Sequence, residues 1–179
     1  MASVTGLTID DFEKLPDALA LNHELVDGEL VEVSGNTLIH NRLRDQLNRV
    51  LSALVEQGNL GQVISEQEFD FDGNAHGPDV SFVSTGKLSL LNPKLRVQRL
   101  VPDLAIEIVS QNDKFEALMK KAVRYRRSGT KEVWVFSIEN RVAFFLNENQ
   151  RVILDENQQF RSDLIPGFAI RIGDLLDRL

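Results

Sequence analysis

The chain has 179 residues, a hydrophobic fraction of 42% and a formal net charge of −7 at pH 7. This length and apolar content suffice for one globular domain, residues 1–179, with its own core. No run approaches the roughly 18 apolar residues of a membrane span, and residues 1–10 lack the pattern of a secretory signal. The absence of cysteine excludes disulfides and thiolate metal sites and fits the reducing cytoplasm, where we expect the protein to act.

The N-terminal third predicts a short helix, a hairpin and a long helix. The short helix lies within residues 10–15, ahead of Pro16. Residues 23–33 read as a hairpin because apolar positions alternate on either side of Asp27-Gly28, a pair that tolerates positive φ. Residues 38–57 carry apolar residues at spacings of three and four, which predicts an amphipathic helix capped at Asn36 or Thr37 and closed by Gly58.

The remainder alternates strands with one more long helix, which indicates an α/β (α+β) domain. The second helix spans about 113–128 and is stopped by Gly129, with Asp113 as its expected N-cap. A loop rich in Leu, Asn, Lys and Arg covers 86–98, and a short helix is expected at 173–179. The predicted strands are 62–71, 78–83, 104–109, 132–136, 141–146, 151–154 and 168–172.

Two acidic residues stand out within the strand-like runs. Glu107 is the only ionisable residue of 104–109, a run that is otherwise apolar and suited to burial on both faces. A lone buried carboxylate is costly unless it is protonated, paired with a cation or bound to a metal. Asp79 begins another short strand just after Pro78. If these two strands are neighbours in register, both carboxylates reach one edge of the sheet and can hold Mg²⁺ or Mn²⁺.

Basic residues gather locally although the chain is acidic overall. Residues 113–132 contain seven basic and three acidic side chains, and 87–99 contain four basic residues and no acid. These segments are either ordinary solvated faces or a surface that contacts phosphates. On the second interpretation, the DNA-binding residues are Lys87, Lys94, Arg96 and Arg99.

The order of these motifs resembles the PD-(D/E)XK nuclease superfamily, and more narrowly the restriction-endonuclease-like family called the Uma-two family. The similarity covers about 24–146 and rests on the order of weak motifs. These are Glu24-Leu25-Val26-Asp27-Gly28-Glu29-Leu30, His40, Pro78-Asp79-Val80, Pro102-Asp103-Leu104, Glu107-Ile108-Val109-Ser110, Lys121 to Tyr125, and Gly129 to Val135.

This resemblance implies a restriction-endonuclease-like core, in which helices flank a central mixed β-sheet joined by an N-terminal hairpin and C-terminal antiparallel strands. It also implies a divalent metal held by Asp79 and Glu107, and hydrolysis of phosphodiester bonds in DNA. The sequence departs from the superfamily motif at Val109, where a lysine is expected two residues after the strand acid. The resemblance assigns that role to Lys121 on the following helix, as the third catalytic residue with Asp79 and Glu107. Periodicity alone leaves open whether its flank or that of Lys120 faces the sheet.

Several further residues are weaker candidates for the site. Glu24 could add a third carboxylate or be an ordinary strand glutamate, and His40 could contact phosphate or be structural. Glu66 or Glu68 could approach the metal from the preceding strand. Asp103 is expected to cap or turn the chain, and Ser110 to shape the junction between strand and helix.

The first hypothesis is therefore a Mg²⁺-dependent DNA endonuclease, acting as a two-fold dimer because many enzymes that cut both DNA strands do so. The alternative is a catalytically inactive domain of the same fold that binds DNA or a protein partner, which Val109 and the acidic net charge favour. A third reading is a hydrolase of RNA or of a small nucleotide. No membrane partner is expected.

Overall fold

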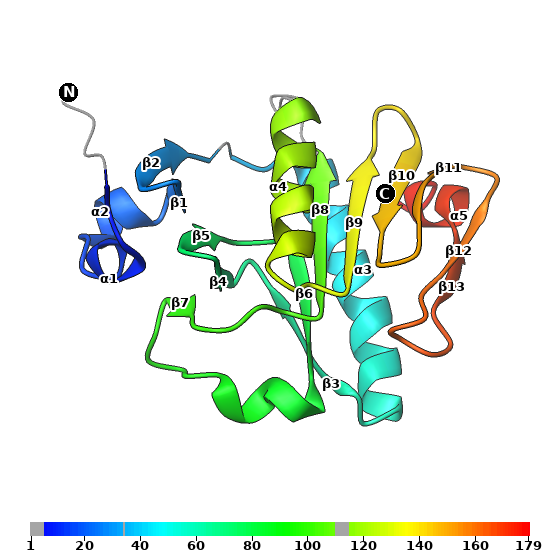
Figure 1. Cartoon of the computed structure of the whole chain (residues 1–179). Coiled ribbons are helices and arrows are strands. Elements are labelled where there is room, and N and C mark those ends of the chain that lie inside the picture. Colours follow the sequence, from blue (N-terminus) through cyan, green and yellow to red (C-terminus); the bar gives the residue numbers. More distant parts are fainter. Residues whose placement is uncertain (1–5, 34, 110–114) are drawn as a thin grey trace.

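The computed structural model describes residues 6–33, 35–109 and 115–179, and a six-stranded mixed sheet lies at its centre (Figure 1). The strand order is β11-β10-β9-β8-β6-β3, in which β8 and β9 are parallel and every other pair is antiparallel. The strands are β3 (Gly61–Ser65), β6 (Val80–Ser84), β8 (Leu104–Val109), β9 (Glu132–Ser137), β10 (Val142–Leu146) and β11 (Arg151–Asp155).

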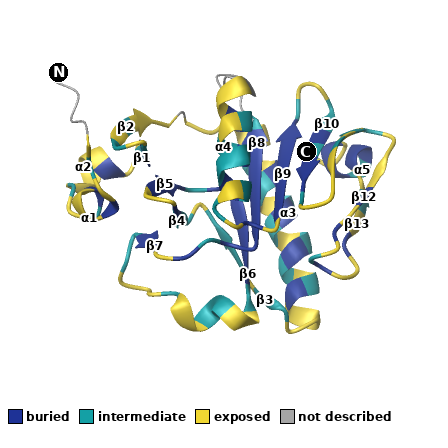
Figure 2. Cartoon of the chain, in the orientation of Figure 1, coloured by how far each residue is buried: buried dark blue, intermediate teal, exposed yellow. Residues whose placement is uncertain are grey.

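Two long helices cover opposite faces of this sheet (Figure 1). The inner face of α3 (Leu38–Gln57) packs Leu43, Leu47 and Leu51 into one apolar core with the sheet. On the other face, α4 (Phe115–Arg127) contributes Leu118, Ala122 and Tyr125 to a second core, which includes Ala105 and Val135 of the sheet. Because helices lie on both faces, β8 and β9 are almost wholly buried (Figure 2).

A second, five-stranded sheet lies beside the first, with strand order β2-β1-β5-β4-β7. Two short helices, α1 (Ile9–Phe12) and α2 (Asp17–Ala20), lie on its side of the molecule (Figure 1). Ile9 and Phe12 of α1 pack there against Leu25, Ala75 and Val97. The strands are β1 (His23–Val26), β2 (Glu29–Glu32), β4 (Glu68–Phe71), β5 (Asn74–His76) and β7 (Val97–Gln98).

The C-terminal segment packs into the same apolar core as α3. β12 (Gln159–Arg161) pairs with β13 (Ala169–Arg171), and α5 (Ile172–Leu176) follows directly. Two rings of this segment pack against Trp134, each at 4.9 Å between ring centroids: Phe160 edge-to-face and Phe168 stacked. No helix within the described residues has the length and apolar character needed to cross a membrane.

The predicted fold class is confirmed, and many predicted elements lie where the sequence placed them. The hairpin turns at Asp27 and Gly28, whose φ angles are 50° and 81°. Thr37 caps α3 by accepting a hydrogen bond from the His40 amide, and α3 ends at Gln57 before Gly58, as predicted. Gly129 follows the end of α4 with φ 110°. The predicted roles of Asp113 and Ser110 lie outside the described residues.

The predicted single strand 62–71 is wrong. β3 pairs with β6 in the large sheet, whereas β4 pairs with β5 and β7 in the second sheet. The break falls at Glu66, whose φ of 53° is incompatible with a continuous strand. The sequence also gave no sign of α2 or β12, and the loop 86–98 contains β7 and most of a 3₁₀ helix, η1 (Thr85–Leu90).

Candidate functional site

Asp79 and Glu107 come from adjacent antiparallel strands, as the site prediction requires. Val80 pairs with Ile106, so Asp79, one residue before β6, adjoins Glu107 on β8. Asp79 Oδ2 accepts a hydrogen bond of 2.7 Å from the amide of Ile108. Both acids are largely buried, with exposed fractions of 9% for Asp79 and 5% for Glu107. The two strands therefore bring two carboxylates together in a sparsely hydrated place.

Lys121 reaches Glu107 from the inner flank of α4. Its Nζ lies 3.0 Å from Glu107 Oε1, and the Tyr125 hydroxyl one turn later donates to the same oxygen at 2.6 Å. Lys120 lies outside this cluster, exposed and paired with Glu116 at 3.0 Å. The structure thus settles the question that periodicity left open, since the flank of Lys121 and Tyr125 faces the sheet.

Glu24 also belongs to this cluster, although it comes from the N-terminal hairpin. Its Oε1 lies 2.7 Å from Lys121 Nζ and accepts a bond of 3.1 Å from the amide of Gly77. Its Oε2 accepts a bond of 2.9 Å from His76 Nδ1. One lysine therefore lies between two carboxylates, Glu24 and Glu107, that belong to different sheets.

His40 approaches the cluster from the first turn of α3. Its Nε2 lies 3.3 Å from Asp79 Oδ1 and 3.1 Å from the carbonyl oxygen of Ile108. Burial alone would lower the pKa of His40, but its contacts with Asp79 and Ile108 outweigh burial and raise it. The His40 imidazole thus contacts two oxygens of the type that bind hard cations.

The pKa values of Glu107, Glu24 and Lys121 are shifted in different directions. Burial, together with the neighbouring Asp79 and Glu24, raises the pKa of Glu107 well above its usual range despite the opposing effect of Lys121. Burial also opposes ionisation of Glu24, but Lys121 and His76 outweigh it and lower the pKa of Glu24 to about 2. For Lys121, the attraction of Glu107 and Glu24 outweighs burial and raises the pKa above its usual range. Lys121 is therefore a charged donor and not a base.

The oxygens of Asp79 and Glu107 fit a hard divalent cation by their chemistry. Glu107 Oε2 receives no hydrogen bond from any residue that the structure describes, and the Ile108 carbonyl lies beside Asp79 through their shared contact with His40. In the described ranges no three His, Asp or Glu side chains are grouped to hold a metal. A cation here would therefore rest on two acids, backbone carbonyl oxygen and water, which is a common arrangement for Mg²⁺.

The other acidic candidates lie outside this cluster. Glu66 is paired with Arg44, and Glu68 is held by both Arg96 Nε at 2.5 Å and Nη2 at 2.8 Å. Asp103 is buried, accepts a bond of 2.9 Å from the amide of Ser84 on β6 and pairs with Lys87 and Lys131. Its carboxylate therefore makes long-range contacts and not the local cap expected from the sequence.

Three of the four predicted DNA-binding residues form ion pairs within the protein. Lys87 lies 3.1 Å from Asp103, Arg96 binds Glu68, and Arg99 lies 2.5 Å from Asp10. Lys94 is exposed, and its side chain has no ion pair among the described residues. Of the four, Lys94 is therefore the best placed to contact an external phosphate.

Sequence reasoning missed His76 and gave Tyr125 no role. His76 is 3% exposed, and its ring lies 5.7 Å from the Tyr125 ring. Local signals were present, because His76 precedes Gly77-Pro78-Asp79 and Tyr125 lies one helical turn beyond Lys121. Neither signal shows which carboxylate the side chain meets.

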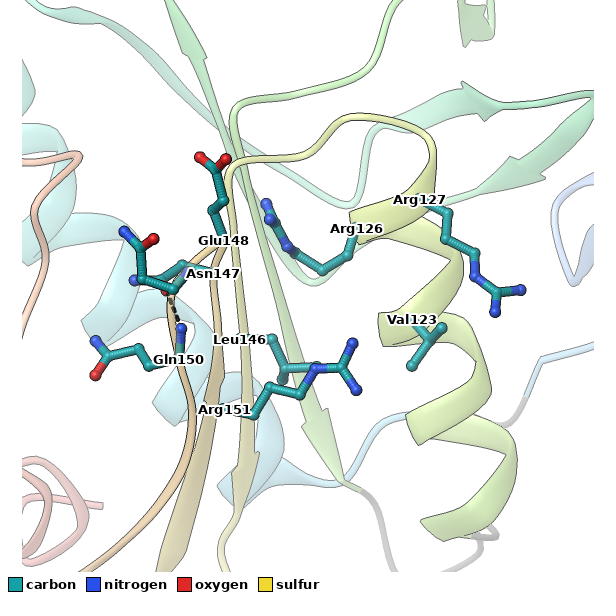
Figure 3. A pocket seen from close by; sticks show the side chains of 9 residues that line it. Val123, Arg126, Arg127, Leu146, Asn147, Glu148, Gln150 and Arg151 are labelled. Carbon is teal, nitrogen blue, oxygen red and sulfur yellow. Dashed lines mark hydrogen bonds between the residues drawn. The ribbon is translucent and has the colours of Figure 1, made fainter.

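A surface depression of about 480 Å³ lies on another part of α4 and shares no residue with the cluster (Figure 3). Arg126 and Arg127 of α4 and Arg151 of β11 are among the side chains that line it, and Arg126 also donates to the Lys131 carbonyl at 2.6 Å. The largely buried acidic cluster and this surface depression are therefore separate.

Comparison with known proteins assigns the fold first. A putative nuclease from Anabaena variabilis superposes with a TM-score of 0.85 over 96% of this chain and 98% of that chain. At 18% sequence identity this likeness shows a shared fold alone. A DrdV–DNA complex matches with a TM-score of 0.41, 14% identity and coverage of 76% of this chain and 12% of that one, a likeness too low to support an argument.

The family follows from the sequence itself. The model of the Uma2 family, described as putative restriction endonuclease, matches residues 9–173. This chain therefore belongs to the Uma2 family, as its motifs indicated. No curated protein matches the chain.

Proposed function

We propose that this chain is a Mg²⁺- or Mn²⁺-dependent endonuclease that hydrolyses phosphodiester bonds in DNA, with Asp79, Glu107 and Lys121 as its catalytic residues. The observation that carries this proposal is the position of the Lys121 ammonium, 3.0 Å from Glu107. A lysine reaches the strand acid even though Val109 occupies the motif position. Membership of a restriction endonuclease family supports the same chemistry.

Asp79 and Glu107 would hold the cation, which when bound lowers the pKa of an attacking water and offsets charge on the phosphate. Lys121 retains its proton, so its role is to donate a hydrogen bond to the water or to the developing phosphorane. Burial opposes ionisation of Glu107, and a bound cation would offset this by stabilising the charged carboxylate.

We further propose that two copies act together, because many enzymes that cut both strands of a duplex act as two-fold dimers. Light scattering during size-exclusion chromatography measures this independently of cleavage. A monomer at micromolar concentration, both free and with DNA, would contradict the proposal.

The test of function is cleavage of supercoiled plasmid DNA by purified protein with Mg²⁺ or Mn²⁺. We expect nicked and linear products, which disappear in Asp79→Asn and Glu107→Gln variants. Lys121→Met should lower the rate about 10²- to 10³-fold, since one electrostatic donor is removed. Lys120→Met is the matched control, because Lys120 is the adjacent lysine but lies outside the cluster.

If the wild-type protein cuts no DNA with either metal, the proposed activity is wrong. Salt-dependent DNA binding without cleavage would then support the inactive DNA-binding alternative. Cleavage of RNA in preference to DNA would change the proposed substrate from DNA to RNA and leave the proposed catalytic residues unchanged.

A further inference from the structure

Lys121 and the acid that it contacts, Glu107, belong to different elements of the fold. Lys121 extends from a helix and not from the strand of Glu107, so a flexible side chain has to cross from α4 to β8. A lysine side chain is long and its ammonium is not directional, so its position depends on what holds it. Glu107 supplies one contact that holds the Lys121 ammonium, at 3.0 Å.

Glu24 supplies the second and shorter contact, at 2.7 Å. Its carboxylate is itself fixed, because the Gly77 amide donates to Oε1 and His76 Nδ1 donates to Oε2. The side chain of Glu24 is only 12% exposed, so solvent competes little for these bonds. Both oxygens of Glu24 therefore already have donors at 3.1 Å or less, whereas Glu107 Oε2 has none among the described residues and Asp79 Oδ1 has only the longer contact of 3.3 Å with His40.

His76 is held in a single place by packing. Its ring lies 6.0 Å from Phe71 and 5.7 Å from Tyr125, and Phe71 stacks on Tyr125 at 4.1 Å. Its Nε2 is buried without a hydrogen-bond partner in the part of the chain that the structure describes. Among the described residues, the bond to Glu24 is therefore the only hydrogen bond that the His76 ring makes. This indicates that the role of the buried imidazole is to hold the carboxylate of Glu24.

We propose that Glu24, oriented by His76, is a positioning residue that fixes the Lys121 ammonium against Glu107, and is not a metal ligand. This inference rests on the proposed function for its catalytic meaning. The two residues come from β1 and β5 of the second sheet, whereas Asp79 and Glu107 belong to the large sheet. The second sheet thereby supplies the support for a lysine that the strand motif lacks.

The first measurement uses metal-free protein and requires no activity. Acetic anhydride acetylates only the neutral amine, with acetate leaving. The rate at Lys121, relative to the exposed Lys120 in the same molecule, therefore reports how strongly its contacts retain the proton and shield the nitrogen. We expect Glu24→Gln to raise this ratio about tenfold or more, because a charged hydrogen bond is lost. Glu29→Gln, on the exposed strand of the same hairpin, is the matched control and should leave the ratio unchanged.

The second measurement separates positioning from metal binding. In single-turnover cleavage at saturating DNA and Mn²⁺, Glu24→Gln should slow the rate about 10- to 100-fold, as small displacements of catalytic groups do. The Mn²⁺ dissociation constant from calorimetry should stay within about twofold, since neither proposed ligand changes. His76→Phe preserves the ring and should act in the same direction with a smaller effect.

A double variant decides whether Glu24 acts through Lys121. Glu24→Gln combined with Lys121→Met should be no slower than Lys121→Met alone, because the group that Glu24 positions is then absent. Additive effects, a tenfold loss of Mn²⁺ affinity in Glu24→Gln, or an unchanged acetylation ratio would each overturn the proposal. If the wild-type protein cuts no DNA, the proposed function fails, while the acetylation ratio still decides whether Glu24 holds Lys121.

Discussion

The Tyr125 hydroxyl donates a hydrogen bond of 2.6 Å to Glu107 Oε1, joining the inner face of α4 to the acid of β8. Both side chains are nearly or fully buried. The Phe71 ring stacks on the Tyr125 ring, with 4.1 Å between the ring centroids. The bond therefore combines helix packing with the orientation of a proposed metal ligand.

Removing this bond while keeping the ring should destabilise the protein. We expect Tyr125→Phe to lower the free energy of unfolding by about 1–3 kcal/mol, because Glu107 loses a donor in a buried place. Urea denaturation followed by Trp134 fluorescence measures the loss. Tyr125→Leu also removes the aromatic stack and should cost more. A Tyr125→Phe protein as stable as the wild type would mean that the bond contributes nothing net.

Acid should remove one identifiable contribution to stability. Burial by itself opposes ionisation of Asp103, but hydrogen bonds from Ser84 and the ammonium groups of Lys131 and Lys87 lower its pKa to about 2, from 3.8. Since the folded pKa is the lower one, this stabilisation is complete above about pH 4 and is lost as the pH falls toward 2.

An Asp103→Asn variant should therefore be less stable at pH 7, by about 1–3 kcal/mol, and its stability should depend less on pH between 4 and 2. Chemical denaturation across this pH range checks both expectations. Asp163→Asn, at an exposed position, is the control and should keep the wild-type slope. Parallel pH curves for wild type and Asp103→Asn would contradict the assignment.

Lys94 and Arg96 lie two residues apart, but their substitution should affect different properties: DNA binding for Lys94 and stability for Arg96. Lys94→Gln should weaken DNA binding and reduce the salt slope by about one, because one phosphate contact is lost. Arg96→Gln should instead lower the free energy of unfolding by about 1–3 kcal/mol, since it leaves the partly buried carboxylate of Glu68 without its charged donor.

Fluorescence anisotropy with a labelled duplex at several salt concentrations, together with urea denaturation, separates the two effects. DNA affinity that falls in Arg96→Gln without any loss of stability would show that Arg96 contacts DNA after all. An unchanged salt slope in Lys94→Gln would remove Lys94 from the DNA-binding surface.

A glycine at the start of β3 tests how closely two strands approach. Gly61 has a φ of 152°, and a Cβ added there would lie 2.1 Å from the Val83 carbonyl oxygen. Gly61→Ala should therefore lower the free energy of unfolding by more than about 2 kcal/mol. Gly86→Ala is the matched control, because no heavy atom lies within 4 Å of its added Cβ. Equal melting temperatures for the two variants would refute the close approach.

Local signals were sufficient for several parts of this molecule. The Asp27-Gly28 turn and both ends of α3 depend on residues within a few positions of one another, so the sequence could specify them. Asp79 and Glu107 could be singled out as candidates because a carboxylate in an apolar strand, or next to a proline that opens one, is conspicuous.

Long-range partners limited the rest. The run 62–71 keeps a strand-like composition across Glu66, and only the different partners of β3 and β4 reveal the break. Nothing in the sequence around Arg96 indicates that Glu68, 28 positions earlier, forms an ion pair with it. Likewise, Glu24 and Lys121 are separated by 97 positions, so their contact follows from the tertiary fold.

The short passage from β5 to β6 has a mechanical consequence. Only Gly77, Pro78 and Asp79 separate His76 in one sheet from Val80 in the other. A rotation of one sheet relative to the other would therefore change the position of His76 relative to Asp79, because both lie in this one short segment. Substitutions that stiffen or loosen this link, such as Pro78→Ala, should alter turnover while leaving every ionisable group of the cluster in place.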